Sequence, residues 1–510
     1  MIVAGVSTLL AVAGGAARGY PSPTVHDEFS YILGADTFLH GRLTNPTHPM
    51  WQHFETFHVL QHPTYSSKYP PANALFIAAG WLLTGRQIGG VWFSFAFMCV
   101  AVFWMLRAWL GAKPGLAISL AFASWAAASY WSYTYWGGAV AAGGGALMLG
   151  ALYRIVEKRG GTGNAVVLAL GLLVLGNSRP WEGLLVSIPA VVVFARWLVR
   201  DSRSDLRYKL GRIVLPMVAV GAIGLACMGV YFKAVTGSWH EMPYAVYQHE
   251  RDASPKLIFQ HPEVVKPQAD KTILWFNALE DTTYRTARTA TGRVNYVRQV
   301  FSDFFALVIP VGLVLPLLLL PLAARGRRTR FAVVTFAWTI AVMGLSTWFL
   351  PHYAAPLVGL VLVAYGECLM WLSRLSVGRH RVGRQIAAAT IAVWFLIGLG
   401  NISFFYASRM RGSTNGPLAW AVQRRLIADT LSRGGQRNLV VVRYGGTHRP
   451  DAEWVYNAAD IDGSSVVWAR DMGTEGNAPL LDYFRDRRPW IVEVDGNNGP
   501  FRVTPYSASP

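Results

Sequence analysis

Asp27 and Glu28 are adjacent acids that directly precede a run of helical character ending near Gly41. Thr24 and Asp27 have the spacing of a capping box, and acids favour the amino terminus of a helix, so one interpretation is that the pair caps this helix. The other interpretation is that a carboxylate here is a catalytic general base. One carboxylate is able to do both, so both interpretations stay open.

Two cations border apolar helical segments, where an unpaired charge is costly. Lys68 comes just before Pro70-Pro71, and its side chain either extends its amine to the bilayer surface or holds a phosphate. Arg179 and Glu182 share the turn GNSRPWEG. Either the two side chains pair within the turn, or Arg179 grips a lipid phosphate while Glu182 orients it.

Aromatic and histidine side chains are expected on the same side of the chain's apolar helices. His352 and Tyr353 lie in WFLPHYAAP, where they cap a helix, join an interfacial aromatic belt or contribute to a site. Tyr133 and Trp136 lie in SYWSYTYWGG. The default interpretation of this segment is again an aromatic belt, and the alternative is stacking on a sugar face.

The sequence offers one weak metal motif. His58 and His62 are four residues apart, as zinc ligands on one helix face are, but Pro63 follows at once and no carboxylate has a fixed spacing to them. A divalent metal is therefore left open, and no other cofactor is predicted. The three cysteines, at positions 99, 227 and 368, are too far apart for a disulfide framework or a zinc motif.

The composition indicates which elements must position these residues. Of 510 residues, 53% are hydrophobic and only 15% are charged, whereas a soluble domain carries about 25% charged residues. Together with 13% aromatic residues, this excludes a disordered chain, a fibre or an ordinary cytosolic enzyme. The net charge of +18 fits basic loops that meet the lipid bilayer, rather than a nucleic-acid partner. We predict a mostly α, polytopic helical membrane protein.

Eleven apolar segments are predicted to span the membrane: 2–17, 88–110, 114–130, 137–156, 164–177, 181–199, 212–234, 303–323, 330–350, 356–375 and 385–406. Residues 71–84 are also apolar, but a helix of this length rises only about 21 Å, too little for about 30 Å of hydrocarbon. We expect this segment to be interfacial or re-entrant. The most basic loops then share one face, which places the amino terminus in the cytoplasm. Residues 1–17 are interpreted as a retained anchor rather than a signal peptide.

The chain divides into two predicted parts. Residues 1–406 form the transmembrane domain, in which 18–87 and 236–302 are large outer segments. Residues 407–510 form a small outer α/β domain, because strand-like runs at 438–444, 464–470 and 489–495 alternate with helix-like runs at 417–433 and 477–487.

The order of these motifs resembles the GT-C membrane glycosyltransferases, in particular the protein O-mannosyltransferase and aminoarabinose transferase group with its uncharacterised bacterial members. The matching features are Asp27-Glu28 just after the first span, the motif Lys68-Tyr69-Pro70-Pro71, and the late turn from His352 to Pro356. The resemblance covers about residues 1–400.

The resemblance implies an inverting transfer at the outer face of a bacterial inner membrane, with the C-terminal domain in the periplasm. A polyprenyl-phosphate-linked sugar would be the donor, and a hydroxyl on a glycan, lipid or protein would be the acceptor. Asp27 would take the proton, while Lys68, Arg179 and His352 would stabilise the leaving phosphate. Two other classes remain as alternatives: a transporter or flippase of lipid-linked sugars, and a non-catalytic membrane assembly protein that presents the C-terminal domain.

Overall fold

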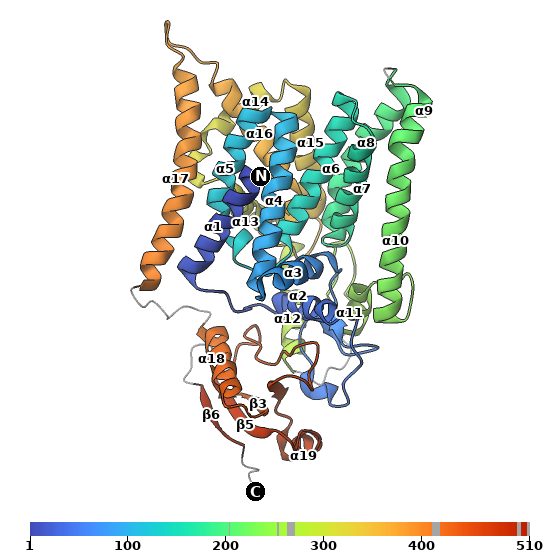
Figure 1. Ribbon diagram of the computed structural model, residues 1–510, viewed down its shortest axis with the longest axis vertical. Helices are drawn as coiled ribbons and strands as arrows, with labels where there is room; N and C mark the ends of the chain where they lie inside the picture. The colour runs from blue at the N-terminus through green and yellow to red at the C-terminus, as the bar shows by residue number, and fades with distance from the viewer. Residues whose placement is uncertain (203, 252–253, 263–270, 411–418, 497–500, 507–510) are drawn as a thin grey trace.

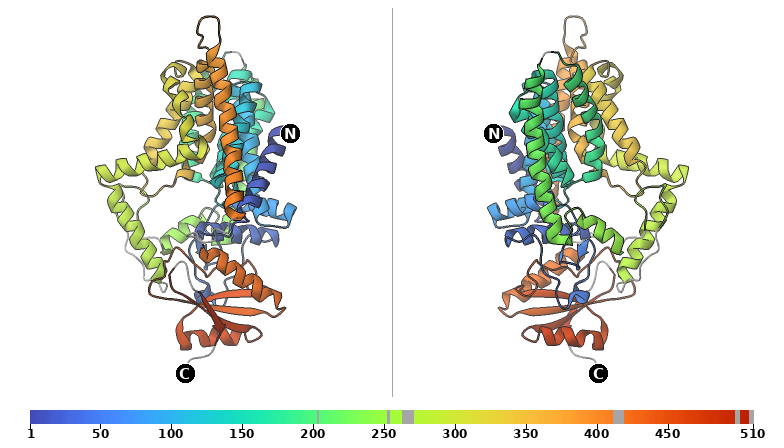
Figure 2. Two further views of the ribbon diagram at one scale, coloured as in Figure 1. Left: turned by 90° about the vertical axis from the view of Figure 1, so that its left-hand side faces the viewer. Right: turned by 90° about the vertical axis from the view of Figure 1, so that its right-hand side faces the viewer.

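A computed structural model describes residues 1–202, 204–251, 254–262, 271–410, 419–496 and 501–506. Its upper part is a bundle of upright helices (Figure 1). These helices are α1 (Ile2–Arg18), α4 (Ile88–Trp109), α5 (Ala112–Ala127), α6 (Gly138–Lys158), α7 (Thr162–Gly176), α8 (Pro180–Arg200), α10 (Leu215–Thr236), α15 (Arg327–Met343), α16 (Val358–Leu372) and α17 (Val382–Met410). Helix α13 (Ala290–Val308) projects sideways from the bundle (Figure 2). Short connecting elements are α9 (Leu206–Tyr208), η3 (Lys209–Val214), η4 (Val311–Leu313), η5 (Leu315–Leu319) and α14 (Leu320–Ala323).

Helices occur at the positions of the predicted spans, with one break. Within the described residues, six helices are long and apolar enough to cross a membrane, or seven if one bent pair counts as a single span. The remaining predicted spans form shorter helices. The prediction of one continuous span over 303–323 is wrong, because the helix ends at Val308 and the chain bends by 82° before it continues. Pro310 explains the break, since proline lacks the amide hydrogen and pushes Ile309 into an extended conformation.

Close packing at the centre of the bundle depends on the small residues of α6. A Cβ atom added at Gly145 would lie 2.4 Å from the backbone oxygen of Pro356, and one at Gly143 would lie 2.2 Å from the ring of Phe97. Both distances are shorter than any van der Waals contact. The Gly/Ala run of this helix therefore lets its backbone approach its neighbours, as small residues do in membrane helix packing.

A layer of shorter elements lies across the lower ends of the upright helices (Figures 1 and 2). It contains α2 (His26–Leu39), η1 (Trp51–Phe54), β1 (Val59–Leu60), β2 (Ser66–Ser67), α3 (Ala72–Thr84), η2 (Tyr130–Ser132), α11 (Pro243–Arg251) and η6 (Pro351–Leu357). Helix α12 (Lys271–Ala287) rises steeply outside the bundle toward α13 (Figure 2). Helix α3 is the segment predicted to be interfacial or re-entrant. It has 13 residues and lies crosswise to the upright helices, which agrees with that prediction.

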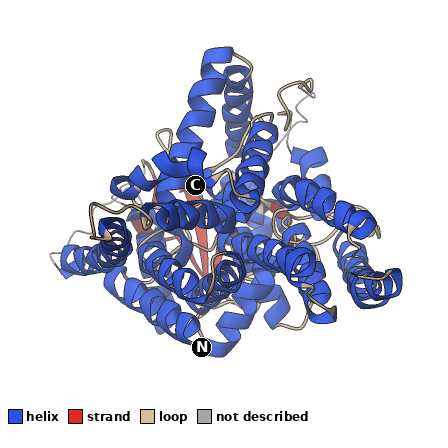
Figure 3. Cartoon of the chain, turned by 90° about the horizontal axis from the view of Figure 1, so that it is seen from above, coloured by secondary structure: helices blue, strands red, loops and turns tan. Residues whose placement is uncertain are grey.

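The C-terminal α/β domain lies below this layer, and its strands are under the helices when the molecule is seen from above (Figure 3). It contains α18 (Ala419–Arg433), β3 (Asn438–Tyr444), β4 (Val466–Arg470), α19 (Gly473–Tyr483), β5 (Arg488–Val494) and β6 (Arg502–Pro505). The strand order is β4-β3-β5-β6, in which β3 pairs parallel with β4 and β5, and β6 pairs antiparallel with β5. The three predicted strands are confirmed and β6 was not predicted. The second helix begins four residues earlier than predicted, and residues 417–418 of the first lie outside the described residues.

The C-terminal domain packs directly on α2. The ring of Tyr456 stacks on Phe29 with a centroid distance of 3.9 Å and an interplanar angle of 10°. The backbone amide of Ala459 donates a hydrogen bond of 2.7 Å to the carboxylate of Asp36. Since the first turn of α2 carries Asp27, the domain helps to fix the helix that holds the predicted base.

Candidate active site

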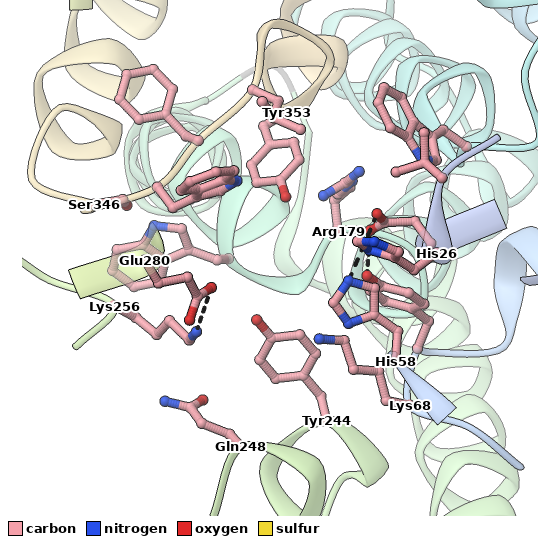
Figure 4. A pocket seen from close by; sticks show the side chains of 18 of the residues that line it. His26, His58, Lys68, Arg179, Tyr244, Gln248, Lys256, Glu280, Ser346 and Tyr353 are labelled. Atoms are coloured by element: carbon pink, nitrogen blue, oxygen red, sulfur yellow. Dashed lines mark hydrogen bonds and ion pairs between the residues drawn. The ribbon is translucent and has the colours of Figure 1, made fainter. Parts of the chain in front are cut away.

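A cavity of about 680 Å³ lies between the helix bundle, the crosswise layer and the C-terminal domain. The predicted site residues that line it are Asp27, Lys68, Trp136, Arg179, Glu182 and Tyr353. Figure 4 shows that several of these side chains converge on one space from different elements. Glu28, Tyr133 and His352 are not among the residues that line this cavity.

Asp27 is in the first turn of α2, and its carboxylate faces the cavity. The hydroxyl of Tyr69 donates a hydrogen bond to Oδ1, and Nε2 of His58 lies 3.8 Å from Oδ2. The side chain of Asp27 is 24% exposed, so a bound molecule is able to reach it. This carboxylate is held by neighbours but not enclosed by them.

Glu28 is adjacent to Asp27 but has a different environment. It is only 3% exposed and accepts hydrogen bonds from the backbone and hydroxyl of Thr24, the backbone of Val25 and, at 2.9 Å, the backbone of Tyr135. Burial raises the pKa of Glu28, and these hydrogen bonds lower it. The capping interpretation therefore applies to Glu28 rather than to Asp27, because Glu28 holds the amino terminus of α2 while Asp27 remains available.

Lys68 directly follows β2, and His58 directly precedes β1. The two strands pair antiparallel, with Val59 opposite Ser67, and the backbone amide of Lys68 donates to the carbonyl of His58. The amine of Lys68 lies 4.2 Å from the ring centroid of Tyr247 and 5.0 Å from that of Tyr244. Lys68 is only 4% exposed, so its charge is directed into the cavity rather than extended to bulk solvent.

Arg179 is the residue before α8, and its guanidinium lies 4.0 Å from the ring centroid of Tyr353. Its Nε is buried and has no hydrogen-bond partner among the described residues. Arg179 and Glu182 form no ion pair in this part of the chain, so the interpretation of a closed pair within the turn is not supported. The carbonyl of Asn177 in the same turn accepts a hydrogen bond from the amide of Ala72, which ties the turn to the start of α3.

His352 and Tyr133 lie next to the site rather than in it. The His352 ring packs against Trp136, at a centroid distance of 4.4 Å, and Tyr130, at 5.1 Å, and these two rings lie 5.6 Å from each other. The guanidinium of Arg18 lies over the ring of Tyr133, 5.0 Å from the ring centroid. His352 therefore supports the aromatic wall, and only Trp136 of the predicted aromatic pair reaches the cavity.

The sequence did not indicate the histidines that accompany Asp27. His58 has a φ of 62° and lies outside any helix, so it and His62 do not share the helix face that the weak metal motif would need. Instead, His26, Asp27 and His58 offer ligand atoms that all lie within 4.8 Å of one another. His26 precedes Asp27 directly, which is a sequence signal, whereas His58 reaches the site only through the β1–β2 hairpin.

These three residues fit a divalent metal ion. Nε2 of His26 and Nδ1 of His58 are buried without a hydrogen-bond partner in the described part of the chain. Burial lowers the pKa of His26 to about 4 and that of His58 well below its ordinary value. Both imidazoles are therefore neutral at pH 7, and two neutral imidazoles with a carboxylate are a donor set that Zn²⁺ accepts. A metal bound here would act as a Lewis acid.

The far wall of the cavity is polar as well. Lys256 and Glu280 form an ion pair of 3.6 Å on the side opposite to His26 and His58 (Figure 4). The C-terminal domain also contributes Arg449 and Asp451 to the lining of the cavity, and the two pair with each other at 2.8 Å. Burial lowers the pKa of His26, and the charge of Asp451 acts on His26 to raise it. The cavity thus has a cationic end beside a carboxylate and a second end with mixed charges.

No protein-family model and no curated protein matches the sequence. Several solved structures match the chain, and two of them superpose with a TM-score above 0.5. ArnT from Cupriavidus metallidurans, bound to undecaprenyl phosphate, superposes with a TM-score of 0.53 and 14% identity, over 96% of this chain and 92% of that chain. The apo state of the same ArnT gives a TM-score of 0.51 and 13% identity over the same shares.

The chain is therefore a multi-pass membrane protein with the GT-C fold, as the sequence motifs predict. The coverage of 96% extends the likeness into the C-terminal α/β domain, which the sequence resemblance did not reach.

Proposed function

We propose that this protein is an inverting glycosyltransferase that moves a sugar from a polyprenyl-phosphate-linked donor to an acceptor hydroxyl at the outer face of the membrane. The observation that carries the proposal is that Asp27, Lys68 and Arg179 line one cavity beside the crosswise helix α3. The ArnT structure that shares the fold was solved with undecaprenyl phosphate, a lipid phosphate of the expected class.

The reaction needs a base next to the acceptor oxygen. Asp27 would accept the hydroxyl proton while the acceptor oxygen forms a bond to the anomeric carbon. The bond between that carbon and the donor phosphate oxygen breaks on the opposite face, which inverts the configuration. The hydrogen bond from Tyr69 holds the Asp27 carboxylate, so that its orientation is set before substrate binds.

The leaving polyprenyl phosphate gains negative charge as the bond breaks. Lys68 and Arg179 supply two cations, and both pack on aromatic rings that exclude water from around them. Fixed charges in such a low-dielectric environment stabilise a transition state without reorganisation. Loss of one such contact would raise the barrier by roughly 2–4 kcal/mol.

The mixed-charge end of the cavity is proposed to receive the acceptor. Lys256 and Glu280 provide donors and acceptors of hydrogen bonds at this end, and Arg449 with Asp451 provide others elsewhere in the lining of the same cavity. Trp275 and Trp348 also line this cavity and offer ring faces to a sugar. We further propose that the C-terminal domain is periplasmic and that its 449–451 loop contacts the acceptor.

The test uses the purified full chain in detergent, supplied with a panel of polyprenyl-phosphate sugars and candidate hydroxyl acceptors. Wild type is expected to transfer sugar from one donor, whereas Asp27→Asn is expected to lose turnover by at least about 10³-fold and still bind donor. Transport of intact donor into vesicles without transfer would favour the transporter alternative and overturn the proposal.

Glu28→Gln is the matched control, because it makes the same chemical change at the adjacent position. This variant is expected to lose stability through its hydrogen bonds at the start of α2, while its folded fraction keeps turnover. Turnover per folded molecule is therefore measured together with thermal unfolding. If Glu28→Gln is folded and inactive while Asp27→Asn is active, Asp27 is not the base.

A further inference from the structure

A second cavity, of about 390 Å³, lies at the end of the bundle away from the C-terminal domain. It is lined by the last turns of α4, α6 and α8 and by the first turn of α15. Helices α9 and α14, which neighbour these ends in sequence, are at the end of the molecule opposite to the C-terminal domain (Figure 1). The glycosyl transfer proposed above makes no use of this space.

The lining of this cavity changes from apolar to basic along α8 and α15. On α8, Val193, Arg196 and Arg200 have the spacing of one helix face, and the chain runs from the bundle interior toward its end. On α15 the order is reversed, because Arg327 begins the helix and Phe331 lies one turn deeper. The two helices thus present arginines at the mouth and apolar side chains below.

One side of the mouth is held in a fixed geometry. Arg328 donates a hydrogen bond of 2.7 Å to the carbonyl of Trp109, and its guanidinium lies 5.3 Å from the ring centroid of Tyr153. Tyr153 in turn stacks on Trp109 at a centroid distance of 4.9 Å. These contacts form a rigid aromatic wall with a cation above it.

The other arginines of the mouth carry charge that the protein does not neutralise. In the described part of the chain, Arg196, Arg200 and Arg327 form no ion pair and no side-chain hydrogen bond. Only two acids, Glu157 and Asp201, line the cavity beside four arginines. An excess of guanidinium groups at the edge of an apolar cavity favours an anion, and the planar donors of arginine suit a phosphate.

We propose that this cavity binds the phosphate headgroup of an anionic phospholipid, whose acyl chain lies against Val193 and Phe331. Basic pockets between membrane helices are known to recognise such headgroups. An apolar floor below the cations favours a lipid over free phosphate, because free phosphate has no apolar part to bury. The basic end of the bundle then binds a lipid and also helps to determine the orientation of the protein in the membrane.

The experiment is native mass spectrometry of the purified full chain, titrated with dioleoylphosphatidylglycerol and, separately, with dioleoylphosphatidylcholine. Wild type is expected to retain one phosphatidylglycerol per chain, and the double variant Arg196→Gln/Arg200→Gln to lose affinity by at least about tenfold. The control Arg379→Gln/Arg381→Gln removes the same charge from an exposed loop of the same end that does not line the cavity. Equal losses in both variants would overturn the proposal.

A second variant tests the apolar part without changing charge. Val193→Phe places a larger side chain at the half-buried floor and is expected to weaken phosphatidylglycerol binding severalfold. Unchanged binding would overturn the assignment of the acyl chain. In a separate arm, inorganic phosphate at millimolar concentration is expected not to displace the lipid. Displacement would identify a site for free phosphate and overturn the lipid assignment. Monodisperse elution of each variant confirms that it is folded.

Discussion

Tyr69 donates a hydrogen bond to the carboxylate of Asp27, although 41 residues separate the two in the chain and they belong to different sequence motifs. Asp27 is in the first turn of α2, whereas Tyr69 follows Lys68 in the motif that precedes α3. The tyrosine thus joins the predicted base to the segment that carries the predicted phosphate-binding cation.

Tyr69→Phe is expected to lower kcat about tenfold or more, because one hydrogen bond to a charged group contributes roughly 1.5–3 kcal/mol. The lost bond orients Asp27 and does not contact the donor, so the KM for the donor should change little. Steady-state kinetics with the donor identified for wild type measures both quantities. Tyr65→Phe, whose hydroxyl bonds to the carbonyl of Asn457 outside the cavity, should retain kcat. Equal losses in the two variants would contradict an orienting role for Tyr69.

Arg179→Lys is expected to reduce activity strongly, although lysine keeps the positive charge. The guanidinium of Arg179 lies 4.0 Å from the ring centroid of Tyr353. The ammonium group of lysine reproduces neither this contact nor the two parallel N–H donors that a guanidinium offers to a phosphate. We expect kcat to fall by roughly 10²-fold. Single-turnover rates with saturating donor separate this loss from weaker binding. A variant with wild-type rates would exclude Arg179 from stabilisation of the leaving phosphate.

Added Zn²⁺ is expected to inhibit transfer. The His26, Asp27 and His58 cluster would bind the ion through the carboxylate that is proposed to accept the proton, and a coordinated carboxylate is a weaker base. Inhibition is measured as a titration of activity and reversed with a chelator. His58→Ala should shift inhibition to higher Zn²⁺ concentration, whereas His62→Ala should not. The same inhibition curve in both variants would place the inhibitory ion elsewhere.

The stability of the C-terminal domain is expected to fall as the pH is lowered from about 6.5 to about 4. Burial lowers the pKa of His448 from 6.5 to about 4, and its ring stacks on Tyr444 at a centroid distance of 4.2 Å. Above pH 6.5 the ring is neutral in both the folded and the unfolded state. Between the two pKa values the unfolded state binds a proton that the folded state does not, so stability is lost by at most about 1.4 kcal/mol per pH unit.

His448→Phe keeps the stacked ring and removes the titrating group, so its unfolding should depend less on pH than that of wild type. Thermal unfolding of the full chain between pH 4.5 and 7.5 makes the comparison. Parallel curves for the two proteins would show that another group is responsible for the pH dependence.

The fold was largely predictable because membrane helices are encoded locally. Hydropathy over each stretch of about 20 residues determines whether it crosses the bilayer, and the alternation of strand-like and helix-like runs similarly predicted the C-terminal α/β domain. Pro310 is a local sequence signal for the break after α13, but the prediction of spans considered hydropathy alone and did not use it. Strand β6 was missed because a four-residue edge strand has too short a pattern to be recognised.

Composition and hydropathy are enough to identify a multi-pass membrane protein. They also indicate Asp27, Lys68 and Arg179 as candidates for chemistry, since a charge beside an apolar helix is costly unless it is paired or binds a ligand. The neighbours of these residues, in contrast, depend on how the chain folds. Spacing could not distinguish Asp27 from Glu28, because the amide of Tyr135 that binds Glu28 comes from a distant turn. His58 and the 449–451 loop likewise reach the cavity through a hairpin and a docked domain. Contacts of this kind depend on how whole elements pack, and no local pattern records them.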